Sequence, residues 1–160
     1  MINKKEIPIG SIIRVKVSDL YTAVCEVVEP YSEECLVRIL RVADQGEKEG
    51  FGAGTEHKFS YSACSGLILL EANLRSIGFI ESDERAWRLM YYFGDMRLYW
   101  KYDKRKCYST FKFRPDFTRK AWTRIECAFI HSLQNIMRFL TGGELEFTWI
   151  EAKEEKGGVS

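Results

Sequence analysis

Short runs of β-branched residues dominate the first part of the chain. Residues 11–16 (SIIRVK), 23–28 (AVCEVV) and 35–42 (CLVRILRV) are rich in Val and Ile, and turn-forming Ser, Asp and Pro residues separate them. Branched side chains fit a pleated, half-buried surface, so these runs predict three strands. The opening Ile-Gly-Ser-Ile-Ile-Arg-Val is typical of a small β-barrel-like unit of the SH3 or OB kind, expected over residues 1–64.

A glycine-rich segment follows the third run. Residues 43–57 (ADQGEKEGFGAGTEH) contain four glycines, whose backbone N–H groups could hold a phosphate. The Lys-Ser/Thr pair that ends a Walker A motif is missing, however, and Glu47, Glu49 and Glu56 would repel phosphate. We therefore expect a hairpin loop, followed by an extended segment at 58–62.

Helical spacing opens the second part of the chain. In residues 67–77 (LILLEANLRSI) apolar side chains recur three and four positions apart, and Gly78 predicts the end of this helix. The runs 85–93, 97–102 and 107–114 then predict strands separated by short turns. Their order along the chain favours a three-stranded antiparallel meander.

A long amphipathic helix is predicted from residues 115–118 to the glycines at 142–143. Its apolar stripe consists of Trp122, Ile125, Phe129, Leu133, Ile136 and Leu140. We expect this stripe to pack on the meander. The predicted fold class is thus α+β: a β-barrel-like unit at 1–64, a helix–meander–long-helix unit at 65–150 with a last strand at 145–150, and a flexible tail at 151–160.

Charge is concentrated in one part of the chain although the total nearly cancels. The formal net charge is +1, from 24 Lys and Arg against 23 Asp and Glu. Residues 85–124 nevertheless carry 12 basic residues against Asp95, Asp103 and Asp116, together with 12 of the 22 aromatic residues. Cations that neutralise phosphates, interleaved with rings that stack on bases, are what recognition of single-stranded nucleic acid or a nucleotide requires.

Strand alternation predicts that both kinds of side chain share one face of the meander. The expected binding surface consists of Arg97, Tyr99, Lys101, Tyr108, Lys112 and Arg114, with Lys104, Arg105 and Lys106 at the hairpin tip. The opposite, apolar face would cover the long helix. The alternative is a solvated sheet face, on which Lys and Arg prevent pairing with other sheets.

A second polar cluster lies on the predicted long helix. His131, Gln134, Asn135 and Arg138 are spaced i, i+3, i+4 and i+7 and so share one helix face. Such a face could read a base edge or orient a substrate, or it could bond to neighbouring loops. Cys127 precedes His131 by four residues, which leaves a Cys–His nucleophile pair open, but the sequence offers no third group to orient it.

The remaining residues exclude several classes of site. The five cysteines are odd in number, widely spaced and without a C-x-x-C pair, and there are only two histidines. This pattern favours buried free thiols in a reducing cytoplasm over a disulfide framework or a zinc site. No metal, cofactor or catalytic motif occurs, so neither cofactor nor metal is expected. No apolar run approaches the roughly 18 residues of a membrane span, and the N-terminus lacks the apolar stretch of a signal peptide.

The C-terminal part resembles a group of small proteins from mobile genetic elements. Residues 130–135 (IHSLQN), 140–145 (LTGGEL) and 74–79 (LRSIGF) are similar to the V-H-Q-L-Q-N, L-T-G-E-E-L and L-x-x-x-G-F elements of uncharacterised proteins of Bacteroides-type phages, prophages and mobile elements. The chain departs from this pattern at Ser132 and Gly143. The group has no assigned activity, so the resemblance implies only a phage or mobile-element origin, a bacterial host cytoplasm, and action by binding.

Together these features predict a non-catalytic binding protein. Its partner would be nucleic acid or a nucleotide, bound at the basic, aromatic sheet. Two alternatives remain: an inhibitor that binds a host defence protein, and a small enzyme with a site near His131.

Overall fold

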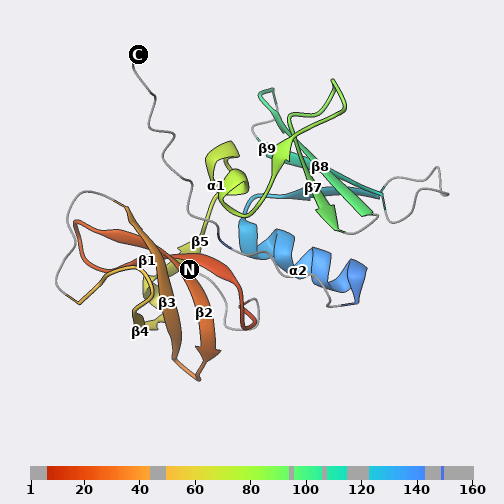
Figure 1. The fold of residues 1–160 in the computed structure, drawn as a ribbon. Coiled ribbons are helices and arrows are strands. Elements are labelled where there is room, and N and C mark those ends of the chain that lie inside the picture. Colours follow the sequence, from red (N-terminus) through yellow and green to blue (C-terminus); the bar gives the residue numbers. More distant parts are fainter. Residues whose placement is uncertain are drawn as a thin grey trace, which may run out of the picture. The chain divides into compact units, whose positions relative to one another are not determined.

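The computed structural model describes residues 7–43, 50–93, 96–105, 108–114, 123–142 and 149 (Figure 1). The chain forms two compact units. Unit 1 comprises Met1–Leu69 and Cys127–Glu146, and unit 2 comprises Leu70–Glu126 and Phe147–Ser160. The main segment of unit 2, residues 70–126, is therefore inserted in the sequence between the two segments of unit 1.

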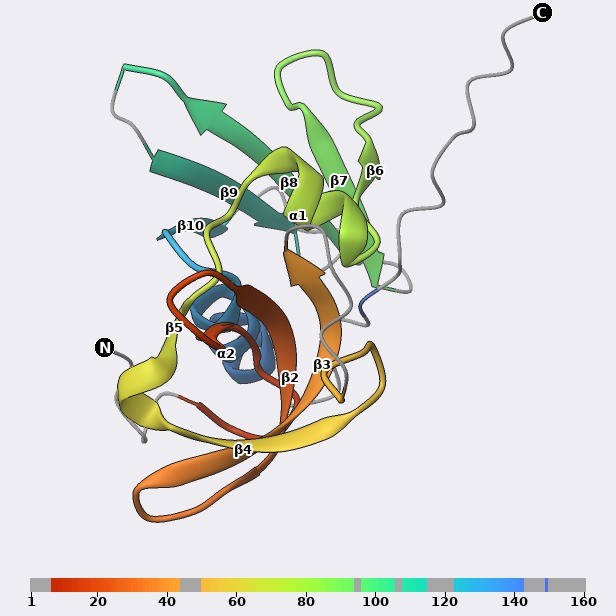
Figure 2. The ribbon, with the colours of Figure 1, turned by 90° about the vertical axis from the view of Figure 1, so that its left-hand side faces the viewer.

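Unit 1 is built on a five-stranded sheet of antiparallel pairs in the order β4-β3-β2-β1-β5 (Figure 2). Its strands are β1 (Ile12–Lys16), β2 (Thr22–Pro30), β3 (Glu34–Ala43), β4 (Glu56–Ser60) and β5 (Cys64–Gly66). A 3-10 helix, Tyr61–Ala63, joins β4 to β5. The three strands predicted from the β-branched runs are confirmed, and the glycine-rich segment connects the paired strands β3 and β4 as expected.

One apolar core fills unit 1. Alternating side chains of β1, β2 and β3 point into it, as the buried positions of β1 illustrate: Ile13 and Val15 are fully buried whereas Arg14 is exposed. The core cluster consists of Ile7, Ile13, Val15, Ala23, Cys25, Val27, Cys35, Val37, Ile39, Tyr61 and Cys64. Burial of these side chains is the main source of stability of unit 1.

The two chain segments that connect unit 1 with unit 2 are paired with each other. The Leu69 backbone N–H donates to the Ala128 carbonyl at 3.1 Å, and the Ile130 N–H donates to the Leu67 carbonyl at 2.9 Å. Ile68 and Phe129 form an antiparallel bridge between them. The chain thus leaves unit 1 and returns to it at the same place.

Helix α2 (Ile130–Thr141) begins directly after this bridge and packs within unit 1. Gln134 is 1% exposed; its Oε1 accepts from the Ile12 N–H at 2.8 Å and its Nε2 donates to the Gly10 carbonyl at 2.9 Å. One turn later Arg138 Nη2 donates to the Ile9 carbonyl at 2.9 Å. The helix ends at Gly142, the predicted position, in the left-handed conformation that glycine adopts without strain.

Unit 2 carries a second five-stranded sheet, in the order β10-β9-β8-β7-β6. Its elements are α1 (Glu71–Ser76), β6 (Ile80–Glu81), β7 (Leu89–Phe93), β8 (Met96–Asp103), β9 (Tyr108–Arg114) and β10 (Thr123–Cys127). The predicted meander is confirmed as β7, β8 and β9, which pair antiparallel in that order. The Phe79 ring lies 6.3 Å from the Phe111 ring in the core of this unit.

An alternating ring of ion pairs fixes α1 to the start of the sheet. Arg75 contacts both Glu71, at 2.8 Å, and Glu81, while Arg88 contacts the same two carboxylates at 3.0 Å each. The hydrogen bonds from Arg75 and Arg88 lower the pKa of Glu71 below its ordinary value. Two of the basic residues of unit 2 are therefore committed to its fold.

The fold class predicted from the sequence is wrong. The structure is mostly β, with two five-stranded sheets in place of a small barrel-like unit and a meander that covers a long helix; the meander is the middle of the second sheet. The described residues contain two α-helices, of 6 and 12 residues. Helix α1 begins at Glu71 because residues 67–69 pair with 128–130. Helix α2 belongs to unit 1, whereas the sequence analysis placed it on the meander.

The error at the long helix has a simple cause. Residues 123–127, predicted as helix, form β10, in which Ile125 is buried while Thr123, Arg124 and Glu126 are exposed. Ile125 and Phe129 are four residues apart, a spacing that a helix produces and that a strand followed by a bridge also produces. The predicted helix start at 115–118, nearly all of the last strand at 145–150, and the tail at 151–160 lie outside the described residues.

Gly66 allows the close approach of β5 to the bridge residue Phe129. A Cβ atom at Gly66 would lie 2.5 Å from Phe129 Cγ and 3.0 Å from His131 Cε1. We expect Gly66→Ala to lower the free energy of unfolding by about 1–3 kcal/mol through overpacking, and Gly66→Ala/Phe129→Ala to cost at least about 1 kcal/mol less than the sum of the single changes. Urea unfolding of the four proteins checks this; simple additivity would contradict it.

Gln134 satisfies two backbone groups of the N-terminal segment. Gln134→Met keeps the side-chain volume but leaves the buried Ile12 N–H and Gly10 carbonyl without these bonds, so we expect a loss of about 2–5 kcal/mol in the free energy of unfolding. The control is Phe139→Ala on the same helix, where the ring is 87% exposed and a change within about 0.5 kcal/mol is expected. Equal stabilities of the two variants in urea would contradict the assignment.

Candidate binding site on the second sheet

The register of β8 and β9 brings most of the predicted site residues to one face. Tyr99 lies opposite Lys112, Lys101 opposite Thr110, Arg97 opposite Arg114, and Asp103 opposite Tyr108. Directly opposed residues project to the same side of a sheet. We call this side the basic face: Arg97, Tyr99, Lys101, Asp103, Tyr108, Thr110, Lys112 and Arg114. Lys104 and Arg105 are exposed in the turn that follows; Lys106 and the side chain of Arg114 lie outside the described residues.

Trp87, which the sequence analysis did not select, covers part of this face. Its ring centroid lies 6.3 Å from that of Tyr99, and the ammonium groups of Lys101 and Lys112 lie 4.9 and 5.7 Å from it. Tyr99, expected on an exposed surface, is therefore only 1% exposed. The interleaving of aromatic and basic residues was visible in the sequence, but Trp87 was assigned to a strand that in fact begins at Leu89.

A tight turn before β7 positions Trp87. The Ser82 hydroxyl accepts from the Glu84 N–H at 3.0 Å and donates to the Glu84 carbonyl at 3.1 Å. The Trp87 backbone N–H donates to the same carbonyl at 3.0 Å. These local bonds reverse the chain and direct the indole over the sheet.

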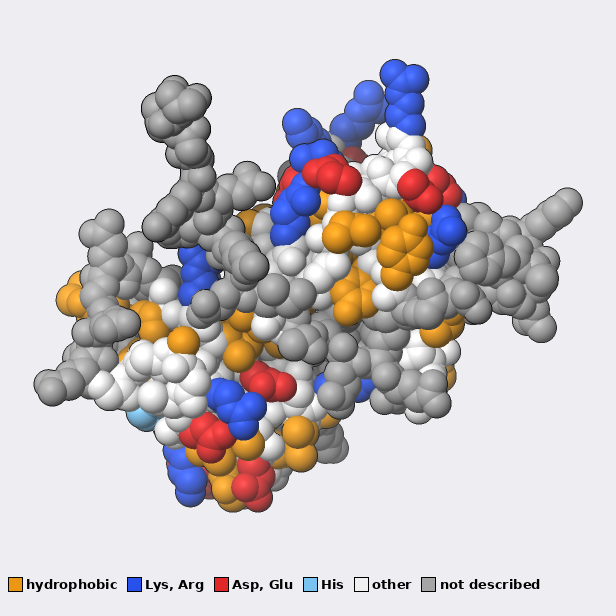
Figure 3. All heavy atoms as spheres, in the orientation of Figure 1, with side chains coloured by type: hydrophobic (Ala, Val, Ile, Leu, Met, Phe, Trp, Pro, Cys, Tyr) orange, Lys and Arg blue, Asp and Glu red, His pale blue; other side chains and the backbone are white. Residues whose placement is uncertain are grey.

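Carboxylates from neighbouring segments neutralise much of the basic face. Asp83 accepts from the Tyr99 hydroxyl at 2.8 Å and from Arg97 Nη1 at 3.1 Å. Glu84 lies 3.3 Å from Lys112 Nζ, and Glu126 accepts from the Tyr108 hydroxyl at 3.1 Å. In Figure 3 acidic and basic side chains accordingly lie side by side over the part of the molecule that carries β7, β8 and β9.

Burial and this network also fix the protonation of Tyr99. Burial raises the pKa of the Tyr99 hydroxyl above its ordinary value, and its hydrogen bond to Asp83 acts in the same direction, against the opposing effect of Arg97. Tyr99 thus stays neutral and serves as a hydrogen-bond donor inside the face. Its ring is part of the support for Trp87 and is not presented to a partner.

Two basic side chains of this region form no ion pair within the described residues. Lys101 is exposed, with its ammonium group 4.9 Å from the centroid of the Trp87 ring, and the Arg105 side chain is exposed at the tip of the β8–β9 turn. By contrast, Arg97 pairs with Asp83 and Lys112 pairs with Glu84.

A hollow opens on the basic face beside Trp87. It has a volume of about 260 Å³ and is lined by Trp87, Lys101, Asp103, Thr110, Lys112 and Arg124. Thr110 lies among these residues and is 2% exposed, and none of the described residues forms a hydrogen bond with its Oγ1. Burying a hydroxyl in this way is unfavourable, so the site contains an unused hydrogen-bonding group.

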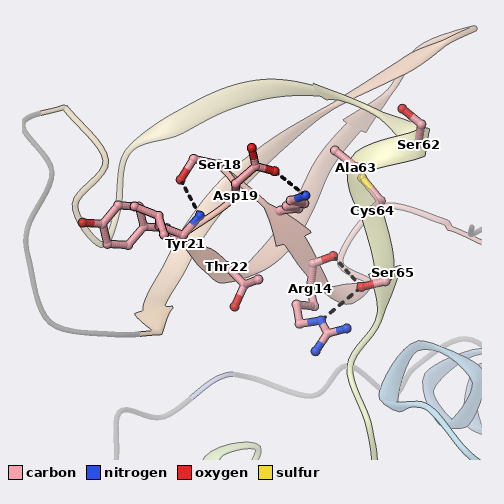
Figure 4. Close-up of a pocket in the computed structure, with 11 residues that line it drawn as sticks. Arg14, Ser18, Asp19, Tyr21, Thr22, Ser62, Ala63, Cys64 and Ser65 are labelled. Atoms are coloured by element: carbon pink, nitrogen blue, oxygen red, sulfur yellow. Dashed lines mark hydrogen bonds and ion pairs between the residues drawn. The ribbon is translucent and has the colours of Figure 1, made fainter.

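Unit 1 has a hollow of its own, between the β1–β2 turn and residues 62–65 (Figure 4). Its volume is about 450 Å³. Arg14 Nε donates to Ser65 Oγ at 3.2 Å on one side, and Lys16 pairs with Asp19 at 2.7 Å on the other. Ser18, Thr22 and Ser62 also line this hollow with hydroxyl groups, and Tyr21 contributes an aromatic ring.

The second predicted cluster is directed into unit 1. His131 is 4% exposed and stacks on Phe129 with ring centroids 5.7 Å apart, and Asn135 is half-buried. Gln134 and Arg138 bond to the backbone of residues 9–12, as described above. The cluster therefore bonds to neighbouring chain segments, which is the second of the two roles expected for it from the sequence.

The described cysteines are free thiols. Cys25, Cys35 and Cys64 are buried, with the Sγ atoms of Cys35 and Cys64 3.7 Å apart, and Cys127 is half-buried. Burial raises the pKa of Cys127 to about 12, so its thiol is protonated at neutral pH. Within the described ranges no group of three His, Cys, Asp or Glu side chains is placed to hold a metal ion.

Neither of the two described helices is long and apolar enough to span a membrane. Compared with protein-family models, curated proteins and solved structures, the chain matches none of them at a significant level. The assignment of a function therefore depends on the side chains described above.

The state of Cys127 can be tested by its reactivity. A rise of the pKa from 9.0 to about 12 lowers the thiolate fraction below pH 9 by about 1,000-fold. We expect native Cys127 to be alkylated by iodoacetamide at pH 8 at least 100 times more slowly than in the urea-unfolded chain, as followed by peptide mass mapping. A native rate within tenfold of the unfolded rate would contradict the raised pKa.

Proposed function

We propose that the protein binds an anionic partner, single-stranded nucleic acid or a nucleotide, at the basic face of unit 2. The observation that carries this proposal is the position of Lys101, which forms no ion pair within the described residues, with its ammonium group 4.9 Å from the centroid of the Trp87 ring. Arg105 adds a second such cation at the tip of the same hairpin. A cation beside an aromatic ring offers a phosphate contact and a stacking platform for a base.

The balance of charges limits the electrostatic attraction between the basic face and such a partner. The described part of the face and its edges holds six cations (Arg97, Lys101, Lys104, Arg105, Lys112, Arg124) and four carboxylates (Asp83, Glu84, Asp103, Glu126), a difference of two. Long-range attraction is therefore modest, and the number of phosphates neutralised should be about two or three. Stacking on an aromatic ring would supply a comparable share of the affinity.

Salt dependence tests this proposal. We expect a labelled single-stranded oligonucleotide to bind with a log–log salt slope of about −1.4 to −2, from two or three neutralised phosphates at roughly −0.7 each. The variant Lys104→Glu/Arg105→Glu/Lys106→Glu should weaken binding at least about tenfold in fluorescence anisotropy, because it reverses the charge of the hairpin tip.

A matched control separates position from net charge. Lys16→Glu/Arg41→Glu/Arg14→Glu reverses three exposed cations of unit 1 and changes the net charge by the same amount. It should alter the affinity less than threefold. Equal weakening by both variants, or no binding of the unaltered protein at low salt, would contradict a site on the basic face.

Binding to a protein is the second candidate. Unit 1 exposes large apolar side chains, with Phe139 87% and Leu20 80% exposed, and such side chains commonly make contacts in protein interfaces. A host defence protein as the partner, like a phage or mobile-element origin, stays a prediction from the resemblance of the C-terminal segment. Loss of oligonucleotide binding in the experiment above would favour this candidate.

A further inference from the structure

We infer that the hollow beside Trp87 is a seat for one nucleoside monophosphate unit, either a free nucleotide or one residue of a strand. This inference rests on the proposed function and names the group that the basic face would recognise. It is based on three groups around one hollow: the Trp87 indole, the Lys101 ammonium and the Thr110 hydroxyl, which has no hydrogen-bond partner among the described residues.

The size of the hollow fits a single nucleotide. Its volume of about 260 Å³ lies just below the range for pockets that hold drug-sized ligands, roughly 300–1,000 Å³. A dinucleotide would exceed it, so further residues of a strand would have to follow the hairpin tip toward Arg105. A strand can thus bind through one seated nucleotide and a few phosphate contacts outside the hollow.

The lining is chemically mixed, which favours a nucleotide over a simple anion. Lys101 from β8 and Arg124 from β10 line the hollow; Arg124 Nη2 pairs with Glu126 at 3.0 Å, whereas Lys101 forms no ion pair within the described residues. Asp103 contributes a carboxylate, whose Oδ1 accepts from the Arg105 backbone N–H at 2.9 Å. Phosphate or sulfate alone would be repelled by Asp103 and would make no use of the indole. A nucleotide has an anionic end for the cations, N–H or hydroxyl donors for the carboxylate, and a ring for Trp87.

The availability of the two lysines differs. Lys112 is held by Glu84 at 3.3 Å, its side chain is 21% exposed, and its ammonium group lies 5.7 Å from the centroid of the Trp87 ring. Lys101 is exposed, lies directly opposite Thr110 in the register, and forms no ion pair within the described residues. Movement of its flexible side chain from the indole toward a phosphate would also open access to the Thr110 hydroxyl.

Thr110 gives the inference a test that separates binding from folding. Thr110→Val keeps the shape of the side chain and removes a buried hydroxyl that has no partner, so the midpoint of urea unfolding should stay the same or rise. If the hydroxyl bonds to a seated nucleotide, the same change should weaken nucleotide binding at least fivefold. The matched control is Thr22→Val in unit 1, which should leave both quantities unchanged.

The probe is thymidine 5′-monophosphate, followed through the indole N–H signals in ¹H–¹⁵N NMR spectra of the full chain, with Trp87→Phe identifying the Trp87 signal. We expect a saturable shift of that signal, a fivefold weaker response in Thr110→Val, and much weaker responses to thymidine or inorganic phosphate alone. Equal responses to phosphate alone, or equal affinity in Thr110→Val, would overturn the inference.

The oligonucleotide experiment distinguishes the two levels of the proposal. If the labelled strand binds with the expected salt slope but thymidine 5′-monophosphate leaves the Trp87 signal unmoved at saturating concentration, the proposed function stands and the nucleotide seat is overturned. If neither binds, both fail. If only the mononucleotide binds, the seat stands and its natural ligand is a free nucleotide.

Discussion

Pairing of residues 67–69 with 128–130 is the constraint on which the architecture depends. It returns the chain to unit 1 after an excursion of 57 residues (70–126), and α2 can then place Gln134 against the backbone of residues 10 and 12. Closing an unstructured loop of that length would cost about 3–4 kcal/mol. Unit 2 has its own core, and its two ends meet at this pairing, so the folding of unit 2 offsets most of that cost. Helix α2 can then join unit 1 as if it followed residue 69 almost directly in the sequence.

On the second sheet, the net charge of a stretch of sequence differs from the charge of the surface to which that stretch contributes. Within residues 85–124 basic residues outnumber acidic ones four to one, yet carboxylates from outside this stretch pair with it: Asp83, Glu84 and Glu126 lie just beyond its ends, and Glu71 and Glu81 contact Arg88. Such short-range pairs leave only a modest long-range field. Cations that form no ion pair within the described residues, above all Lys101, then matter more for a partner than the net charge of the stretch. The same turn that supplies two of the carboxylates also brings Trp87 to the face, so neutralisation and the aromatic platform have one origin.

The sequence predicted what depends on neighbours along the chain and failed where distant segments decide. Runs such as 35–42 become strands because their β-branched side chains favour them in any context, and alternation correctly placed Arg97, Lys101 and Lys112 on one face. Residues 123–127 satisfy both a helical and an extended pattern, and the sheet resolves the ambiguity in favour of a strand because β9 offers an edge to pair with. Gln134 looked like a recognition residue since its partners, 122 and 124 residues away, leave no trace in local spacing. Trp87 was missed for the same reason: its role comes from a turn and from two strands that follow it.

Two buried polar side chains illustrate the difference between a residue that serves the fold and one that is free to serve a ligand. Gln134 uses both ends of its amide on backbone groups, and the fold explains its presence completely. Thr110 is buried to the same degree, but its hydroxyl forms no hydrogen bond within the described residues, and an aliphatic side chain of equal shape would suit the fold at least as well. The Ser11 hydroxyl and the Trp100 indole N–H are also buried without a partner in the described part of the chain, yet neither residue lines one of the two hollows described. In the hollow beside Trp87, the Thr110 hydroxyl, an aromatic ring and the Lys101 ammonium occur together, and this combination is a stronger indication of a binding site than the net charge of the stretch.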